Sequence, residues 1–279
     1  MKHIITQSDI DGYCHALAAD ERAAGTIAKY RHDLTAFTRF LGGRSVTREN
    51  AAGWKAHLQG RGYAPVTVNA MLSAVNGFFR FMGWHIKIKF LHIQHQLFRD
   101  PARELTRAEY DRLLAAARER GQTRLSLIME TLCATGIRVS ELRYITAEAA
   151  RNGRATIALK GKIRTILLPA KLCRKLAKYA KKQKIASGEV FLTKSGKSIS
   201  RRQVWFELKR LCRAAKVEPS KVFPHNFRHL FATIFYKACR DISRLADVLG
   251  HSSIETTRIY LMVSGAEQQK QLDRLGLVS

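Results

Sequence analysis

The chain has 279 residues, enough for one large domain or two of ordinary size. Hydrophobic residues make up 46% of it, so it can bury a core, and 49 Lys and Arg against 22 Asp and Glu give a net charge of +27. Such an excess favours a polyanionic partner, although a surface tuned for solubility or for ribosome association would also explain it. The charge is uneven: residues 1–100 carry 13 basic and 7 acidic side chains, and residues 101–279 carry 36 and 15.

The composition argues against several classes of protein. No two cysteines have CxxC spacing, so the sequence predicts neither a zinc site nor a disulfide framework. The start, MKHIITQSDIDGY, lacks the apolar core of a signal peptide, and no apolar run is long enough to cross a membrane. We therefore expect a cytoplasmic protein with reduced thiols, no membrane contact, no metal and no cofactor. The five cysteines are Cys14, Cys133, Cys173, Cys212 and Cys239.

The first part of the chain predicts a small bundle of four helices with short loops. Apolar residues recur at steps of three and four within residues 26–41, 46–58 and 64–84. Gly42 and Gly43 end the first of these helices, and Thr47 is a plausible N-cap of the second. Residues 85–104 then break the helical period, and we interpret them as an extended basic linker.

The second part of the chain is mixed. Thr106 and Glu109 have the spacing of a capping box at the start of a helix. The segment RATIALKGKIRTILLP, residues 154–169, alternates on both sides of a Lys-Gly-Lys turn and predicts a β-hairpin. The rest of this part is mostly helical. The expected fold is mainly α with a small β-sheet (α+β), divided into an N-terminal bundle of residues 1–84, a linker of residues 85–104, and a domain of residues 105–279 that ends in a tail helix.

The stretch FPHNFRHLFAT, residues 223–233, places two histidines and an arginine in an apolar run. Pro224 suits the first turn of a helix, so His225 and Arg228 would lie one above the other near its start. Helix N-termini attract anions, and a phosphate diester would bind an imidazole, a guanidinium and a helix dipole together. A structural Arg–carboxylate pair beside a core histidine explains the pattern equally well. We expect His229 to face away and to be structural.

Two further motifs carry basic residues. In TGIRVSEL, residues 135–142, Glu141 lies one turn after Arg138 and could hold its guanidinium. Arg138 would then be a second arginine besides Arg228, and two guanidiniums can bracket one phosphate. Many surface helices contain the same RxxE pattern. Lys160 lies at the mouth of the predicted hairpin, where it could donate a proton to a leaving oxygen. A solvated turn lysine is the simpler interpretation, and Lys162 is a competing candidate.

The last motif is LGHSSIETTRIYL, residues 249–261. Gly250 fits the end of one helix, and Ser252 with Glu255 fits a capping box for the next, so His251 would lie just before a helix start. Tyr260 would lie about two turns into that helix. A tyrosine hydroxyl is a poor nucleophile at neutral pH, because its ordinary pKa is about 10, but concentrated positive charge favours the phenolate. Taken alone, Tyr260 would be interpreted as a core or surface aromatic.

Together and in this order, Arg–Glu, Lys, His-x-x-Arg, His and Tyr closely resemble the tyrosine recombinase (phage integrase) family, as a two-domain, Xer-like member. TGIRVSEL resembles the first arginine box, PHNFRHLFAT the His-x-x-Arg box, and LADVLGHSSIETTRIY the last box. APVTVNAMLSAVNGFFRFMGW resembles the helical, SAM-like core-binding domain of the family. The resemblance thus covers nearly the whole chain.

The resemblance implies a site-specific DNA recombinase. Arg138 and Arg228 would hold the scissile phosphate, His225 and His251 would hydrogen-bond it, and Tyr260 would attack phosphorus to form a 3′-phosphotyrosyl bond. His225 would also assist proton transfer. Because the covalent bond conserves the energy of the cut strand, resealing would need neither ATP nor metal.

Two supporting roles are also implied: Lys160 would protonate the departing 5′ oxygen, and Glu141 would fix Arg138. The implied partner is double-stranded DNA, bound near the nucleoid by a homo-oligomer that forms a tetramer when sites are paired. The tail after Val263 would pack on its own subunit or on a neighbour. The cellular role would be integration or excision of a mobile element or resolution of DNA dimers. Two alternatives are a type IB topoisomerase and a DNA-binding protein without catalysis.

Overall fold

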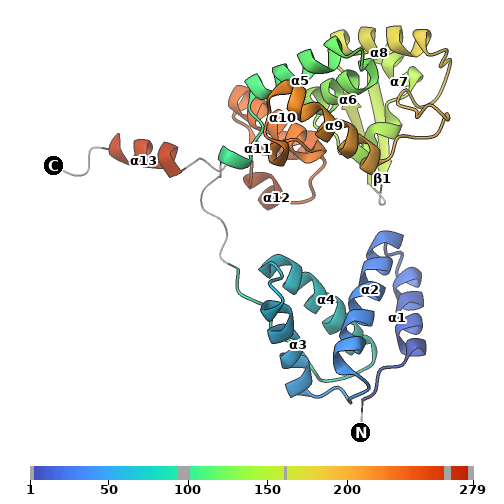
Figure 1. The fold of residues 1–279 in the computed structure, drawn as a ribbon, viewed down its shortest axis with the longest axis vertical. Helices are drawn as coiled ribbons and strands as arrows, with labels where there is room; N and C mark the ends of the chain where they lie inside the picture. Colours follow the sequence, from blue (N-terminus) through green and yellow to red (C-terminus); the bar gives the residue numbers. More distant parts are fainter. Residues whose placement is uncertain (1–2, 94–100, 160–161, 261–264, 276–279) are drawn as a thin grey trace. The chain divides into compact units, whose positions relative to one another are not determined.

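The computed structural model describes residues 3–93, 101–159, 162–260 and 265–275. The chain divides into two compact units, Met1–His95 and Gln96–Ser279. In the described residues the first unit is built from helices, and the second from helices with one two-stranded sheet (Figure 1). The predicted class, mainly α with a small β-sheet, is confirmed.

The first unit is a bundle of four helices, as predicted. Thr47 caps the third helix through a hydrogen bond from the Asn50 amide, and Pro65 opens the fourth, where its missing N–H leaves no bond unmade. The apolar faces meet in an aromatic core, with Phe37, Phe78 and Phe79 fully buried. The helices are α1 (Gln7–Ala19), α2 (Ala24–Leu41), α3 (Arg48–Gly60) and α4 (Pro65–Phe81).

Residues 85–93 run along α4 and are held there by two asparagine side chains. The Asn76 side chain accepts from the Ile88 amide at 2.8 Å and donates to the Ile88 carbonyl at 2.9 Å. Asn69, two turns earlier, forms the same pair with Leu91 at 2.8 and 2.9 Å. Each side-chain amide therefore supplies the two hydrogen bonds that a neighbouring strand would give to an extended backbone. Ile88 is buried in the core of this unit.

The second unit begins with α5, whose N-cap Thr106 forms the predicted capping box with Glu109. The predicted hairpin is also present: the two strands pair antiparallel from Arg154 opposite Leu167 to Leu159 opposite Lys162. The remaining elements are helical. The elements are η1 (Pro101–Arg103), α5 (Arg107–Glu119), α6 (Thr123–Thr135), η2 (Val139–Tyr144), α7 (Ala147–Asn152), β1 (Arg154–Leu159), β2 (Lys162–Leu167), α8 (Ala170–Lys182), α9 (Arg201–Ala215), η3 (Pro219–Lys221), α10 (Pro224–Cys239), α11 (Ile242–Leu249), α12 (Ile254–Arg258) and α13 (Gly265–Asp273).

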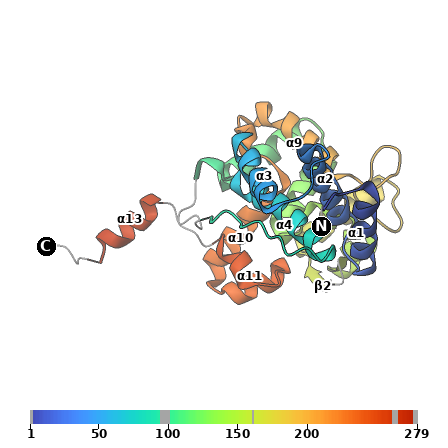
Figure 2. The ribbon, with the colours of Figure 1, turned by 90° about the horizontal axis from the view of Figure 1, so that it is seen from below.

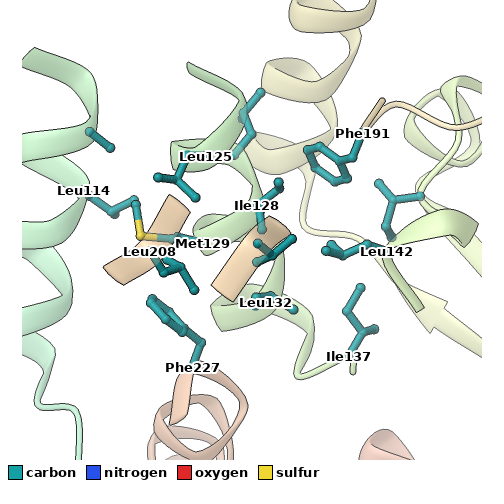
Figure 3. Packing of buried hydrophobic residues seen from close by; sticks show 14 of the residues in the cluster. Leu114, Leu125, Ile128, Met129, Leu132, Ile137, Leu142, Phe191, Leu208 and Phe227 are labelled. Carbon is teal, nitrogen blue, oxygen red and sulfur yellow. The ribbon is translucent and has the colours of Figure 1, made fainter. Parts of the chain in front are cut away.

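Helix α6 is the centre of the second core (Figure 3). Its Ile128, Met129 and Leu132 are fully buried among side chains from α5, α9 and α10. Helix α10 packs against α6 and also against α11, and both ribbon views show α10 beside α11 (Figures 1 and 2). The C-terminal end of α6, the first half of α10 and the end of α11 are thereby brought together, and the polar residues of the predicted motifs lie at this junction.

We predict that Asn76→Ala lowers the free energy of unfolding of the first unit by about 1–3 kcal/mol, because it leaves the amide and carbonyl of Ile88 without their partner. The measurement is urea denaturation followed by tryptophan fluorescence, since Trp54 and Trp84 both lie in this unit. Gln59→Ala, an exposed position on α3, is the control and should change stability by less than about 0.5 kcal/mol. Equal effects of the two changes would contradict the prediction.

Candidate active site

Arg138 and Glu141 form a pair at the start of η2. Arg138 is its N-cap, and the Arg138 amide donates to Glu141 Oε2 at 2.7 Å while Arg138 Nη1 donates to Oε1 at 3.1 Å. The Glu141 side chain is 2% exposed, whereas the side chain of Arg138 is 42% exposed. The carboxylate is therefore a buried anchor, and the guanidinium that it holds remains open to a ligand.

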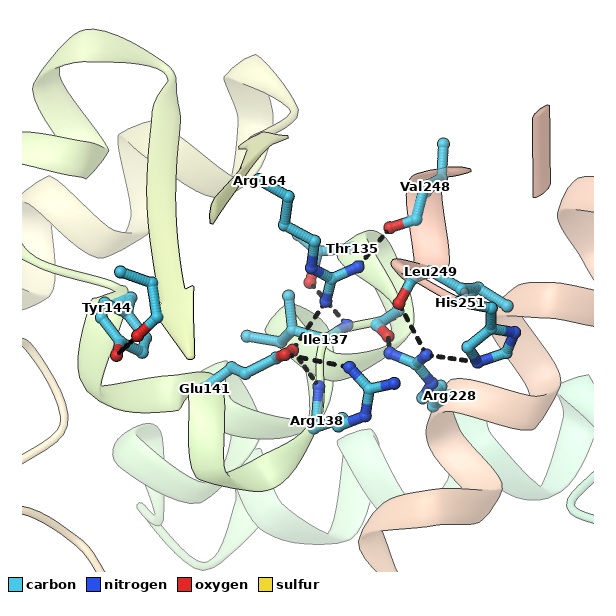
Figure 4. Close-up of polar contacts among 12 residues, drawn as sticks. Thr135, Ile137, Arg138, Glu141, Tyr144, Arg164, Arg228, Val248, Leu249 and His251 are labelled. Atoms are coloured by element: carbon cyan, nitrogen blue, oxygen red, sulfur yellow. Dashed lines mark hydrogen bonds and ion pairs between the residues drawn. The ribbon is translucent and has the colours of Figure 1, made fainter. Parts of the chain in front are cut away.

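Arg228 is buried in α10, with 2% of its surface exposed. Its guanidinium donates to the Gly136 carbonyl, and its Nη2 donates to the Leu249 carbonyl at 2.8 Å (Figure 4). These carbonyls stand at the C-terminal ends of α6 and α11, where the helix dipole is negative. Burial, with the positive charge of Arg138, lowers the pKa of Arg228. Helix ends, rather than a carboxylate of the described residues, hold this arginine in place.

The C-cap of α6 is a position that only glycine fits. Gly136 has a φ of +63°, and a Cβ there would lie 2.3 Å from Phe231 Cδ1 and 3.0 Å from Leu249 Cδ2. A larger residue would strain the left-handed backbone and push apart α6, α10 and α11. Gly136 thus lets the carbonyl that it carries face Arg228.

His251 lies directly after α11, where its ring joins Arg228 to the last helix of the motif. Its Nε2 is 2.9 Å from Arg228 Nη2, and its Nδ1 is 2.9 Å from Thr257 Oγ1. Burial and the positive charges of the surrounding arginines lower the pKa of His251 to about 4. Burial, followed by Arg228 and Arg138, also lowers the pKa of His225. Both rings are therefore neutral at pH 7.

Tyr260 lies two residues after α12, which ends at Arg258, rather than two turns into a helix as expected from the sequence, and 3% of its surface is exposed. Its ring is stacked on the His251 ring, with centroids 5.9 Å apart and an angle of 11° between planes, and the His225 centroid is 6.5 Å away. Burial lowers the pKa of Arg228, and Tyr260 is among the groups that act in the opposite direction, so the phenol lies near the guanidinium. The structure thus brings together Arg138, Glu141, His225, Arg228, His251 and Tyr260.

Two further expectations from the sequence turn out differently. The N-cap of α12 is Ser253, which accepts from the Glu255 amide at 3.2 Å, so the predicted capping box at Ser252 is wrong. His229 does not face away: its ring packs edge-to-face on Tyr260 at 4.8 Å, and its Nδ1 lies 3.8 Å from Glu104 Oε1. Lys160 falls outside the described residues, and so does the side chain of Lys162.

Arg164 of β2 belongs to the site and was missed in the sequence. Its Nη2 donates to Glu141 Oε2 at 2.8 Å and its Nη1 to the Val248 carbonyl at 2.7 Å (Figure 4). A Cβ on Gly250 would lie 2.6 Å from Arg164 Cδ, so the loop after α11 can lie against Arg164 only with glycine at position 250. Arg164 therefore ties the hairpin to η2 and to the end of α11. One signal in the sequence could have indicated this position. Arg164 lies two residues from Ile166 in the strand, so its side chain lies on the same face as that buried residue.

Two features are absent from the part of the chain that the structure describes. No helix there is long and apolar enough to cross a membrane. Nor is any group of three or more His, Cys, Asp or Glu side chains among the described residues arranged to hold a metal ion.

Comparison with known proteins gives matches over both units. Residues 103–267 match the phage integrase family, and residues 10–85 match the phage integrase N-terminal SAM-like domain. The tyrosine recombinase XerC of Roseiflexus castenholzii is 32% identical over 87% of this chain and 85% of its own length. XerA of Pyrococcus furiosus is 28% identical over 96% and 94%.

Solved structures share the fold. XerH site-specific recombinase bound to its difH substrate before cleavage aligns with a TM-score of 0.71 at 19% identity, over 95% of this chain and 84% of that one. A lambda integrase tetramer bound to a Holliday junction aligns with a TM-score of 0.72 at 20% identity, over 93% and 77%.

We predict that Glu141→Gln lowers the free energy of unfolding by about 3 kcal/mol, because two arginines lose the buried charge that they share. Glu255→Gln is the matched control. Glu255 also pairs with an arginine three residues away, but its side chain is 75% exposed, so its loss should cost less than about 1 kcal/mol. Urea denaturation of both variants measures the difference, and similar costs would contradict the buried anchor.

We also predict that stability falls as the pH is lowered from about 6.5 towards 4. The unfolded chain takes up a proton on His251 in this range and the folded chain does not, so the folded state loses up to about 1.4 kcal/mol per pH unit from this group. His225 acts in the same direction. Urea denaturation at several pH values should give a shallower dependence for His251→Gln than for the parent, and identical slopes would refute the assignment.

Proposed function

The chain belongs to the phage integrase family of tyrosine recombinases, and from this premise we propose that it cleaves and rejoins duplex DNA at specific sites through a covalent bond to Tyr260. One observation carries the proposal: a buried tyrosine stacked on a neutral histidine lies beside a buried arginine, with a second, accessible arginine in the same site.

The two arginines are the phosphate-binding groups in this proposal. Arg138 offers an exposed guanidinium that is already oriented by Glu141, and Arg228 adds positive charge next to the Tyr260 hydroxyl. In-line attack on a phosphodiester builds up negative charge on the non-bridging oxygens, and fixed guanidiniums lower the energy of that state without having to reorganise. His225 and His251, both neutral, act as hydrogen-bonding partners of the same phosphate.

The chemical step exchanges one phosphodiester bond for another. The Tyr260 oxygen forms a bond to phosphorus, the bond to the 5′ oxygen breaks, and the 3′ phosphate stays on the tyrosine. The tyrosine proton leaves with the help of His225, and Lys160 supplies a proton to the departing 5′ oxygen. Attack by a 5′ hydroxyl of a partner strand reverses the step, so the phosphotyrosyl bond conserves the energy of the cut.

The partner is double-stranded DNA. The excess of basic residues in 101–279 suits phosphate contacts, and affinity should fall steeply as salt is raised. The XerH and lambda integrase structures include DNA complexes, the latter a tetramer on a Holliday junction. By analogy, this chain acts as a tetramer when two sites are paired, in the cytoplasm and on the nucleoid. Residues 1–84 would bind core DNA, and residues 105–279 would carry catalysis. Residues 85–104 would link these two domains.

The same chemistry serves integration or excision of a mobile element and resolution of DNA dimers. A type IB topoisomerase would share the covalent step but would relax supercoils without exchanging partners. A plasmid with two target sites separates these functions, because only a recombinase converts it into exchanged products. A DNA-binding protein without catalysis would give neither result.

We predict that Tyr260→Phe abolishes the covalent protein–DNA adduct and leaves DNA binding intact, because it removes only the attacking oxygen. The assay is incubation with a nicked suicide duplex, in which the released strand diffuses away and traps the adduct for denaturing electrophoresis. Tyr179→Phe on α8, which packs at the edge of the core, is the control and should form adduct like the parent. Adduct formation by Tyr260→Phe would sink the proposal.

A further inference from the structure

A buried threonine one turn before Tyr260 completes a chain of contacts through the site. Thr257 lies in α12 and its surface is fully buried. Its Oγ1 is 2.9 Å from His251 Nδ1, and its carbonyl accepts from the Tyr260 amide at 3.0 Å. Thr257 therefore touches the histidine through its side chain and the tyrosine segment through its backbone.

The contacts of His251 determine where its proton lies. An arginine side chain can only donate hydrogen bonds, so Nε2, 2.9 Å from Arg228 Nη2, must be an acceptor. A neutral imidazole then carries its single proton on Nδ1, and that proton is donated to Thr257 Oγ1. The lowered pKa of His251 agrees with a neutral ring. The DNA-free protein thus holds the Nδ1–H tautomer.

Binding of a phosphate demands the opposite tautomer. The oxygens of a phosphodiester only accept hydrogen bonds, so Nε2 of His251 can contact one only when Nε2 carries the proton. If the ring stays neutral, Nδ1 must then become an acceptor. Through exchange with water, one proton leaves Nδ1 and one arrives at Nε2, with no net change in charge.

The partner of Nδ1 must therefore serve both states. A hydroxyl group can accept from Nδ1–H and, after rotation about its C–O bond, can donate to a bare Nδ1. A backbone carbonyl or a carboxylate could serve only the first state, and an apolar side chain neither. Threonine is suited to this position because its hydroxyl is buried, held by a helix, and able to reverse its role.

We propose that Thr257 is a positioning residue that acts through His251 and supports both tautomers of its ring, Nδ1–H in the free protein and Nε2–H on DNA. The inference rests on the proposed function, since it takes a DNA phosphate as the group that replaces Arg228 at Nε2. In the second state Arg228 is released from the ring and both groups face the phosphate. Docking of α12, which ends two residues before Tyr260, is thereby linked to the preparation of His251.

The tautomers can be observed directly. Nitrogen-15 NMR of the histidine-labelled protein separates protonated from bare ring nitrogens, and His251→Gln identifies the His251 signals. We expect Nδ1–H in the free protein, and Nε2–H when the Tyr260→Phe protein binds duplex DNA. A free protein with Nε2–H, or a ring that keeps Nδ1–H on DNA, would overturn the proposal.

The kinetic test compares three variants on the suicide duplex at saturating DNA. Thr257→Val removes the hydroxyl at constant shape and should slow adduct formation by about tenfold or more, with DNA affinity unchanged. Thr257→Ser keeps the hydroxyl and should restore most of the rate, which a purely structural role would not require. Thr233→Val is the matched control, because the buried Thr233 hydroxyl has no hydrogen-bond partner among the described residues.

The results of these experiments distinguish failure of the proposed role of Thr257 from failure of the proposed recombinase function. If Thr257→Val cleaves at the parental rate, or if Thr257→Ser is as slow as Thr257→Val, the role of the hydroxyl is refuted while the recombinase function stands. If the parent itself forms no adduct, the proposed function fails, and the tautomers of the free and DNA-bound rings still decide the inference. Should Thr257→Val unfold, the rate of the serine variant and the parental NMR spectra decide between support and refutation.

Discussion

The burial of one guanidinium organises the whole site. Arg228 is 2% exposed and would be costly to bury alone, so three groups compensate it: the carbonyls that end α6 and α11, and the ring of His251. For both carbonyls to reach one guanidinium, the ends of two helices must meet beside a third. Gly136 makes this possible, since any Cβ there would collide with Phe231 and Leu249. The packing of α6, α10 and α11 and the position of the arginine are thus one constraint.

The balance of charge around this constraint favours an anion. One buried carboxylate, Glu141, is shared by Arg138 and Arg164, and Arg228 is held by neutral groups among the described residues. Three guanidiniums therefore face one carboxylate. Burial, and after it the positive charge of these arginines, lowers the pKa of His251 and of His225 and favours uncharged rings. A phosphodiester would supply the missing negative charge, whereas another carboxylate from the chain would weaken binding to DNA.

The network also links three segments that carry different parts of the chemistry. Arg164 connects the hairpin, on which Lys160 is expected to act, to Glu141 and to the end of α11. His251 connects the end of α11 to α12 through Thr257, and Tyr260 follows the end of α12 by two residues. Strand β2, η2, the end of α11 and α12 are therefore held together by shared side chains rather than by independent loops. A substitution that removes one of these contacts should therefore also weaken the others, because hydrogen bonds in a connected network strengthen one another.

The sequence by itself determined the elements and most of the site. Helical periodicity, the caps at Thr47 and Thr106, the hairpin strands and the motif residues Arg138, Glu141, His225, Arg228, His251 and Tyr260 were all readable, because each depends on neighbours within a few positions or on motif order. Only the tertiary structure decided the partners. Alternation in β2 shows that Arg164 and Ile166 share a face, but whether that face is buried depends on Glu141 and Val248, which lie 23 and 84 residues away. The rotation of α10 and α12 likewise decided that His229 meets Tyr260 and that Thr257 meets His251, since helical spacing places a residue on a face without saying what covers it.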